Sequence, residues 1–356
     1  MNYPRVTIDA DALRNNLTVV RRLAPQSRVL AAIKANAYGH GLVPSARALA
    51  SADAFGLARL DEALALRKAG FNQHLVLLEG VVCAEDLQAA GAGSLEIVVH
   101  AFDQIQMLEA YGGAHQFVVW LKIDTGMHRL GMAPEDFTDA YHRLSRCRAV
   151  RSLRLMTHLA AAEAPDGSFT RRQLATFDAT THGFRGERSI ANSAGLIGWP
   201  QTRVEWVRPG LMLYGMSPMP HKSAADLGLR PAMTLATRLI ALHRVRAGET
   251  VGYGGVWSAA RDSQIGVAAI GYADGYPRVM PNGAPVLVNG REASVAGRVS
   301  MDMTAIDLTD LPDARVGDEV VLFGDGLPAE RVADYANTLG YELVCRVTER
   351  VSREWK

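Results

Sequence analysis

Eight short apolar runs alternate with amphipathic stretches before residue 210, and this alternation limits the possible folds more than any other feature of the chain. The runs are continuously apolar, as expected of strands that are buried on both faces. Strands of this kind that alternate with helices are typical of parallel sheets. The eight expected strands are Val29–Ile33, Ala54–Ala58, Leu75–Leu78, Glu96–Val99, Phe117–Ile123, Leu153–Thr157, Arg188–Ala191 and Val204–Val207.

The stretches between these runs carry helix start and stop signals. Asp11 is a candidate N-cap for the helix that begins the chain. The segment 61–68 places acids first and bases last and is followed by Gly70, a natural C-terminal stop. Pro134 stands where a further helix would begin. Eight such units predict an α/β fold with a (β/α)8 TIM-type barrel, and an open doubly wound sheet is the alternative.

The pattern changes after residue 215, and a second domain is expected there. Met216–Pro231 contains three prolines and is typical of a linker. Asn289-Gly290 between two apolar runs predicts a β-hairpin. We therefore expect a barrel domain over residues 1–230 and a mainly antiparallel β domain over 231–356. Its remaining expected elements are strands at Leu239–Val245, Ser263–Tyr272, Pro285–Val288 and Glu319–Phe323, a helix at Ala329–Leu339 and a final strand at Tyr341–Val347.

Charge and cysteine content narrow the class of protein. The 38 Lys and Arg balance 37 Asp and Glu, and no basic cluster occurs, which argues against binding to nucleic acid or to a membrane surface. No apolar run approaches the length of a membrane span, and the N-terminus has no secretory core. The three cysteines are far apart, so neither disulfides nor a zinc site are indicated. A cytoplasmic location is expected.

Polar side chains stand at the carboxyl ends of the expected strands, where barrel enzymes place their chemistry. Lys34 is the most informative, because it follows the apolar run Val29–Ile33. A lysine in such a place can be desolvated and become a nucleophile for a Schiff base. The other residues at strand ends are Glu79, His100, Lys122, His158, Asn192, Ser193 and Arg208.

The loops after the last two strands are candidates for a phosphate site. Loops in this place of a barrel commonly bind phosphate through backbone N–H groups, which here points to Ser193, Gly210 and Leu211. The Tyr38 hydroxyl could contribute a further hydrogen bond. A nucleophilic lysine with a phosphate site suggests pyridoxal 5′-phosphate (PLP), and a Schiff-base aldolase is the alternative. Motifs for dinucleotides, nucleotide triphosphates and zinc hydrolysis are missing, and no metal site is expected.

An ordered set of motifs resembles the alanine racemase family along nearly the whole chain. The strongest stretch is Ala32-Ile33-Lys34-Ala35-Asn36-Ala37-Tyr38-Gly39-His40-Gly41. The further matching segments are 121–131, Thr157-His158-Leu159, Ala191-Asn192-Ser193-Ala194, Arg208-Pro209-Gly210, Gly252-Tyr253-Gly254, 271–275 and 297–302. The resemblance implies the interconversion of L-alanine and D-alanine with PLP as cofactor.

The resemblance also implies a role for each matching residue. Lys34 would hold PLP as an internal aldimine and act as the base on the D-alanine face, and Tyr253 would be the base on the L-alanine face. Arg208 would face the pyridine nitrogen, and Arg129 with the backbone N–H of Met301 would bind the substrate carboxylate. The cofactor-binding residues that it implies are Lys34, Tyr38, His158, Asn192, Ser193, Arg208, Gly210 and Leu211.

Further implications concern assembly and substrate access. In the family, the residue matching Tyr253 acts at the partner subunit's site in a head-to-tail homodimer, and the lysine matching Lys122 is often carbamylated. The expected entrance residues are Tyr272, Arg278 and Asp302. One departure is that Glu349 replaces a tyrosine found near the phosphate or the entrance in many members, and Ser352 replaces a proline. We expect Glu349 to turn away from the phosphate or to pair with Arg350 or Arg353.

Other functions remain possible at this level. A PLP-binding homeostasis protein resembles only the first domain, so the second domain with Tyr253 argues against that function. A PLP decarboxylase of similar architecture usually places a glutamate where Arg208 stands. A racemase with a broader range, which accepts serine or basic amino acids, is the strongest rival.

Overall fold

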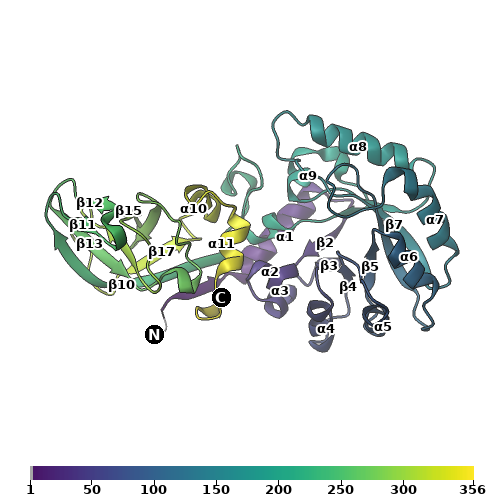
Figure 1. The fold of residues 1–356 in the computed structure, drawn as a ribbon, viewed down its shortest axis with the longest axis horizontal. Coiled ribbons are helices and arrows are strands. Elements are labelled where there is room, and N and C mark those ends of the chain that lie inside the picture. Colours follow the sequence, from purple (N-terminus) through teal and green to yellow (C-terminus); the bar gives the residue numbers. More distant parts are fainter. Residues whose placement is uncertain (1–2) are drawn as a thin grey trace.

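The computed structural model describes residues 3–356 and has two lobes joined end to end (Figure 1). One lobe is the barrel, with its helices around a parallel sheet. The other lobe is a mainly antiparallel β domain. Helices α10 (Ala329–Tyr335) and α11 (Gly340–Arg346) lie where the two lobes meet, and the C-terminus lies near that junction (Figure 1).

Eight parallel strands close into the barrel, and β2 pairs with β9 to complete the circle. All eight strands predicted from the sequence are confirmed. One interior layer packs Trp120 against Trp206 edge to face, with ring centroids 5.3 Å apart. The barrel is therefore filled by side chains rather than open. The strands are β2 (Arg28–Ala32), β3 (Ala54–Leu57), β4 (His74–Leu77), β5 (Glu96–Val99), β6 (Phe117–Lys122), β7 (Val150–Met156), β8 (Glu187–Ser189) and β9 (Trp206–Val207).

The helices of the barrel follow the predicted pattern with one correction. Asp9, not Asp11, caps the first helix, because the Asp9 side chain accepts a hydrogen bond from the Ala12 N–H. Gly70 does follow the end of α4 in the left-handed conformation, and Pro134 begins a short 3-10 turn before α7. The helices are α1 (Ala10–Leu23), α2 (Lys34–Tyr38), α3 (Leu42–Ala48), α4 (Leu60–Lys68), α5 (Ala84–Ala92), α6 (Phe102–Glu109), α7 (Phe137–Arg146), α8 (Ser168–Thr181) and α9 (Ser193–Gly198).

The second lobe is built on one sheet of order β13-β16-β15-β14-β17-β10-β1-β18, in which β10 also pairs with β13. The predicted hairpin is confirmed: β14 pairs with β15, and both turn residues, Asn289 and Gly290, have positive φ. The strands are β1 (Arg5–Ile8), β10 (Met233–Val245), β11 (Thr250–Val251), β12 (Trp257–Ser258), β13 (Ser263–Ala268), β14 (Pro285–Val288), β15 (Arg291–Val295), β16 (Thr304–Asp307), β17 (Glu319–Phe323) and β18 (Ser352–Trp355).

Two features of this lobe differ from the sequence-based expectation. The segment predicted as a final strand, Tyr341–Val347, is mostly helix α11, because Gly340, Leu343 and Val344 repeat with the period of a helix and form its buried face. Strand β1 falls within the range predicted for the barrel domain. It pairs instead with β10 and with β18, the true final strand.

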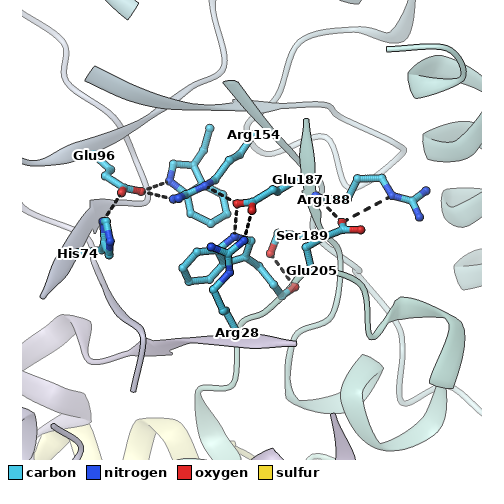
Figure 2. Close-up of polar contacts among 10 residues, drawn as sticks. Arg28, His74, Glu96, Arg154, Glu187, Arg188, Ser189 and Glu205 are labelled. Atoms are coloured by element: carbon cyan, nitrogen blue, oxygen red, sulfur yellow. Dashed lines mark hydrogen bonds and ion pairs between the residues drawn. The ribbon is translucent and has the colours of Figure 1, made fainter. Parts of the chain in front are cut away.

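A cluster of charged and aromatic residues closes the amino-terminal end of the barrel (Figure 2). Arg154 lies between Trp120 and Trp206, with its guanidinium carbon 4.8 Å and 4.7 Å from their ring centroids. It donates to Glu96 at 2.6 Å and to Glu187 at 3.0 Å. The indole N–H groups of the two tryptophans donate to the same two carboxylates. Each of these polar groups therefore has a partner, and removing one would leave a charge unpaired at the end of the barrel opposite the carboxyl ends of the strands.

Within residues 3–356, no helix is both long enough and apolar enough to span a membrane. The same residues contain no group of three or more His, Cys, Asp or Glu side chains arranged to hold a metal ion.

Candidate active site

A cavity of about 630 Å³ opens at the carboxyl ends of the barrel strands. It brings together ten of the residues predicted from the sequence: Lys34, Tyr38, Glu79, Lys122, Arg129, His158, Asn192, Ser193, Arg208 and Gly210. Leu211 is buried directly after Gly210. The remaining wall is formed by Leu30, Ala32, Ala35, Leu78, Leu130, Met156, Thr157, Tyr341 and Cys345.

Lys34 and Tyr38 begin and end an unusual turn. Ala35, Asn36, Ala37 and Tyr38 all have φ between 52° and 54°, the left-handed region that residues with a Cβ rarely adopt. The turn directly follows β2, so Lys34 stands at the end of a buried strand, as the sequence predicts. Its conformation places both side chains on the cavity wall.

Arg208 is fixed by four acceptors at the end of β9. Its guanidinium donates to Ser189 Oγ at 2.6 Å, to the Thr157 carbonyl at 2.5 Å and to the Ile190 carbonyl at 3.2 Å, and it lies 3.3 Å from His158 Nδ1. Burial lowers the pKa of Arg208 to about 10, so it remains charged at neutral pH. The cavity therefore contains a rigid, buried cation.

The cavity wall is strongly cationic. Burial, followed by the charges of Arg208, Arg129 and Lys34, lowers the pKa of Lys122 to about 8. Burial and then the same cations, Arg208 first and Lys122 among them, hold the pKa of His158 well below its ordinary value. Such a site favours ligands that bring negative charge.

One end of the cavity fits a phosphate. Ser193 Oγ accepts from the Gly210 N–H at 3.0 Å and from the Met212 N–H at 3.4 Å, which ties the two loops together beside the Tyr38 hydroxyl. A Cβ at position 210 would lie 2.7 Å from the Tyr38 hydroxyl oxygen, so only glycine leaves this space free. Hydroxyls and backbone N–H groups around such a space are suited to a phosphate, and Lys34 lines the same cavity. The residues present therefore fit PLP.

The loop that carries Arg129 is held by its own backbone contacts. Asp124 Oδ1 accepts from the Gly126 and His128 N–H groups at 2.9 Å and 3.0 Å. The Met132 N–H donates to the Lys122 carbonyl at 2.8 Å, which closes the loop onto the end of β6. Arg129 is thus presented to the cavity from a fixed turn rather than from a free segment.

The predicted residues of the second domain lie outside this cavity. Tyr253 is 69% exposed and Met301 is 53% exposed. Tyr272 is partly exposed in a 3-10 turn, and Arg278 and Asp302 are exposed. These five residues do not meet the residues around Lys34 within one chain, so their roles stay predictions.

Sequence reasoning missed Tyr341 and Cys345, which α11 brings to the cavity. The assignment of that segment as a strand hid them, although the spacing of four residues is one helical turn. Burial raises the pKa of Tyr341 to about 12 and raises that of Cys345, so both side chains are neutral donors at pH 7. The second lobe therefore completes the cavity of its own barrel.

Glu349, which stands where many family members have a tyrosine, turns away from the cavity. Glu349 is exposed and lies outside the cavity wall that the described residues form. Arg350 pairs with Asp302 at 2.7 Å and approaches the buried Asp274 at 3.5 Å. The Arg353 guanidinium donates to backbone carbonyls, the closest being that of Val347 at 2.8 Å.

The fold and the cavity define a two-domain barrel enzyme whose site suits an anionic cofactor and a carboxylate substrate. Comparisons with known proteins then identify the family. The alanine racemase N-terminal domain family matches residues 8–218, and the alanine racemase C-terminal domain family matches residues 232–355. The chain belongs to the alanine racemase family and is an isomerase.

Individual relatives agree with this assignment. The chain is 50% identical to an alanine racemase of Vibrio cholerae over 98% of this chain and 97% of that protein. It is 48% identical to a biosynthetic alanine racemase of Salmonella typhimurium, over 100% and 99% of the two chains. The crystal structure of biosynthetic alanine racemase from Pseudomonas aeruginosa superposes with a TM-score of 0.98 at 45% identity, with full coverage of both chains.

Proposed function

We propose that this alanine racemase interconverts L-alanine and D-alanine with PLP bound through Lys34. The observation that carries the proposal is that one cavity brings together Lys34, the backbone of Gly210 beside the Tyr38 hydroxyl, and the buried cation Arg208. When bound, PLP supplies the electron sink that makes the α-hydrogen of the amino acid acidic.

The phosphate of PLP would bind at one end of the cavity, and Arg208 stands at the other side. The Tyr38 and Ser193 hydroxyls and the backbone at Gly210 and Leu211 bind its phosphate. Asn192 supports this end, because it caps α9 by accepting from the Gly195 N–H at 2.9 Å and donates to the Leu159 carbonyl at 3.1 Å. His158, which lines the same cavity, would contact the cofactor.

Arg208 would donate to the pyridine nitrogen of bound PLP. Ser189, Thr157, Ile190 and His158 all accept from it, so the guanidinium keeps its protons and would leave that nitrogen unprotonated. The ring is then a weaker electron sink than with a carboxylate in this position. We infer that this arrangement limits side reactions that need a long-lived carbanion.

Two bases act on opposite faces of the substrate. Lys34 Nζ exchanges the α-proton on the D-alanine face, and Tyr253 Oη exchanges it on the L-alanine face. Tyr253 is exposed on the second lobe, away from Lys34 of its own chain. This placement supports a homodimer in which Tyr253 acts at the partner subunit's site, with Met301 beside it as a carboxylate donor.

Arg129 binds the substrate carboxylate through its two parallel N–H groups. Tyr272, Arg278 and Asp302 form the entrance. Asp302 is held by Arg350 at 2.7 Å, which supports a fixed rather than a loose position for this carboxylate. A cytoplasmic enzyme that supplies D-alanine, as in the relatives described as biosynthetic, is the role we propose.

The decisive experiment follows L-alanine in deuterium oxide with purified protein and added PLP, and measures α-deuteration and product chirality together. Rapid deuteration with D-alanine appearing supports two bases on opposite faces. Deuteration with retained L configuration would show one working base and contradict the role given to Lys34. Borohydride reduction followed by peptide mass spectrometry should place the cofactor on Lys34 and on no other lysine.

A further inference from the structure

The turn of α2 needs support from outside itself. Four successive residues with a Cβ adopt the left-handed conformation between Lys34 and Gly39. Each such residue is strained, by about 1–2 kcal/mol in a left-handed helix. Strain of this size persists only where the surroundings determine the backbone. The contacts that impose this turn are therefore part of how the site is built.

We propose that Glu62 and His40 are positioning residues that impose the left-handed turn and so hold Lys34 and Tyr38 on the cavity wall. The effect of these two residues on cofactor binding rests on the proposed function. Their support of the turn's backbone does not depend on that function.

Glu62 supports the beginning of the turn. It lies in the first turn of α4, and its Oε1 accepts from the Asn36 N–H at 3.0 Å. Its Oε2 accepts from the Ala58 and Arg59 N–H groups at 3.3 Å and 3.4 Å. One carboxylate thus joins the turn after β2 to the end of the neighbouring strand β3. Hydrogen bonds to a charged acceptor are stronger than neutral ones, so this is a firm attachment.

Asn36 extends the attachment to the next helix. Its Oδ1 accepts from the Leu42 N–H at 2.7 Å, and its carbonyl accepts from the Gly41 N–H at 2.9 Å. Asparagine tolerates the left-handed region better than most residues, because its side chain bonds to nearby backbone. Glu62 therefore binds Asn36, whose side chain in turn binds the first residue of α3.

His40 supports the end of the turn through hydrogen bonds to its backbone carbonyls. It is completely buried, and its Nδ1 lies 3.0 Å from the Ala37 carbonyl and 2.9 Å from the Tyr38 carbonyl. Carbonyls only accept, so Nδ1 carries the proton. Nε2 is buried and has no hydrogen-bond partner among residues 3–356, which fits a neutral ring, and burial lowers the pKa of His40 to about 4.

The same histidine helps to place the Tyr38 ring. His40 packs on Tyr214 with ring centroids 4.6 Å apart, and Tyr214 stacks on Tyr38 at 4.7 Å. On the remaining side, Gly39 lies so close to α11 that a Cβ would be 2.4 Å from the Val344 carbonyl oxygen. Ala37, Tyr38 and Gly39 are thus buried against Tyr214 and α11, whereas Asn36 lies on the exposed side, where Glu62 holds it.

The test compares Glu62→Ala with Asp86→Ala. Asp86 occupies the same place in the first turn of α5 and is also half-buried, but it lies away from the turn. The first measurement is amide hydrogen exchange over residues 34–42 in the cofactor-free proteins, and the second is the Kd for PLP by equilibrium titration. In Glu62→Ala, we expect exchange at Asn36 to quicken and the Kd to rise about tenfold or more, because a charge-assisted hydrogen bond is lost. Asp86→Ala should match the unmodified protein in both.

Conservative variants separate positioning from general damage. Glu62→Gln keeps an oxygen for the Asn36 N–H and should lie between Glu62→Ala and the unmodified protein. His40→Asn keeps an N–H where Nδ1 stands and should bind PLP more tightly than His40→Leu. The KM for L-alanine should change less than the Kd for PLP, since Arg129 is untouched.

Several results would overturn the proposal. They are unchanged exchange and unchanged PLP affinity in Glu62→Ala, or equal losses in Asp86→Ala. If the unmodified protein takes up no PLP, the proposed function fails instead. The exchange measurement in the cofactor-free chain still decides whether Glu62 holds the turn.

Discussion

Arg208 Nη2 lies 3.3 Å from Nδ1 of His158. A guanidinium can only donate, so the imidazole faces it with an unprotonated nitrogen. Burial, and then the Arg208 charge, hold the pKa of His158 well below its ordinary value. His158 is therefore neutral when the protein is folded at pH 7, and its proton, on Nε2, is available to a neighbouring acceptor.

This relationship predicts a loss of stability in mild acid. The unfolded chain binds a proton at His158 below about pH 6.5, whereas the folded chain resists it, so the free energy of unfolding falls as the pH drops below 6.5. His40, whose pKa burial lowers to about 4, contributes in the same direction. Urea denaturation at pH 7.5 and pH 5 should show a smaller difference for His158→Asn than for the unmodified protein. Equal differences would mean that His158 is protonated in the folded state.

Lys122 is expected to form a carbamate. Burial and the charges of Arg208, Arg129 and Lys34 lower its pKa to about 8. At pH 8 a substantial fraction of the amine is therefore neutral and can attack carbon dioxide. The product is an anion among three cations, which Coulomb attraction stabilises. Protein equilibrated with ¹³C-bicarbonate should show a carbamate resonance in its ¹³C spectrum that Lys122→Met lacks. The same resonance in both proteins would assign the carbamate elsewhere.

Gly210→Ala should weaken PLP binding through one steric contact. The added methyl would lie 2.7 Å from the Tyr38 hydroxyl oxygen, and the Tyr38 ring is stacked on Tyr214 and cannot withdraw freely. The φ of Gly210 is −124°, which lies outside the left-handed region that favours glycine. We expect the Kd for PLP to rise about tenfold, equal to about 1.4 kcal/mol. Gly198→Ala is the control, because its nearest neighbour would be 3.6 Å away, and PLP titration of both variants decides the matter.

The cluster at the amino-terminal end of the barrel should matter for stability and not for catalysis. Arg154 joins Glu96 and Glu187 between two tryptophan rings (Figure 2), and Arg154→Met leaves the buried Glu96 without its cation. Removing one partner of a buried pair costs about 3–5 kcal/mol. Urea denaturation should show a loss of this order, with kcat and KM near those of the unmodified protein. Arg291→Met, which removes an exposed pair with Asp313, should cost less than about 1 kcal/mol.

The barrel could be predicted from the sequence because its information is local. Each strand is a short apolar run, and a strand closed by a polar residue such as Lys34 or Arg208 marks the end where a site forms. The hairpin at Asn289-Gly290 was predictable for the same reason, since both residues tolerate positive φ. Lys34, Lys122, His158 and Arg208 therefore meet in one cavity as their places at strand ends predict, whereas Arg129 was predicted from the family resemblance alone.

The parts that were missed depend on distant contacts. Strand β1 pairs with β18 across almost the whole chain, with Arg5 opposite Ser352, and no local pattern encodes that pairing. The segment with Tyr341 and Cys345 is apolar enough for either a strand or a helix, and packing against the barrel decides for the helix. Glu62 resembles any other acid in the first turn of a helix until the turn at Asn36 is seen beside it.

Subunit complementation tests where Tyr253 acts. Lys34→Ala and Tyr253→Ala homodimers should each lack racemase activity, because each site then has only one base. In a mixed dimer, the intact Lys34 of one chain meets the intact Tyr253 of the other at one site, while the second site lacks both. Random mixing makes half of the dimers mixed, so denaturing and refolding the two variants together should restore about one quarter of the unmodified activity. Tyr253 is 69% exposed, so its substitution should leave folding intact, which circular dichroism checks. No recovery from a mixture shown by mass spectrometry to contain mixed dimers would place both bases in one chain.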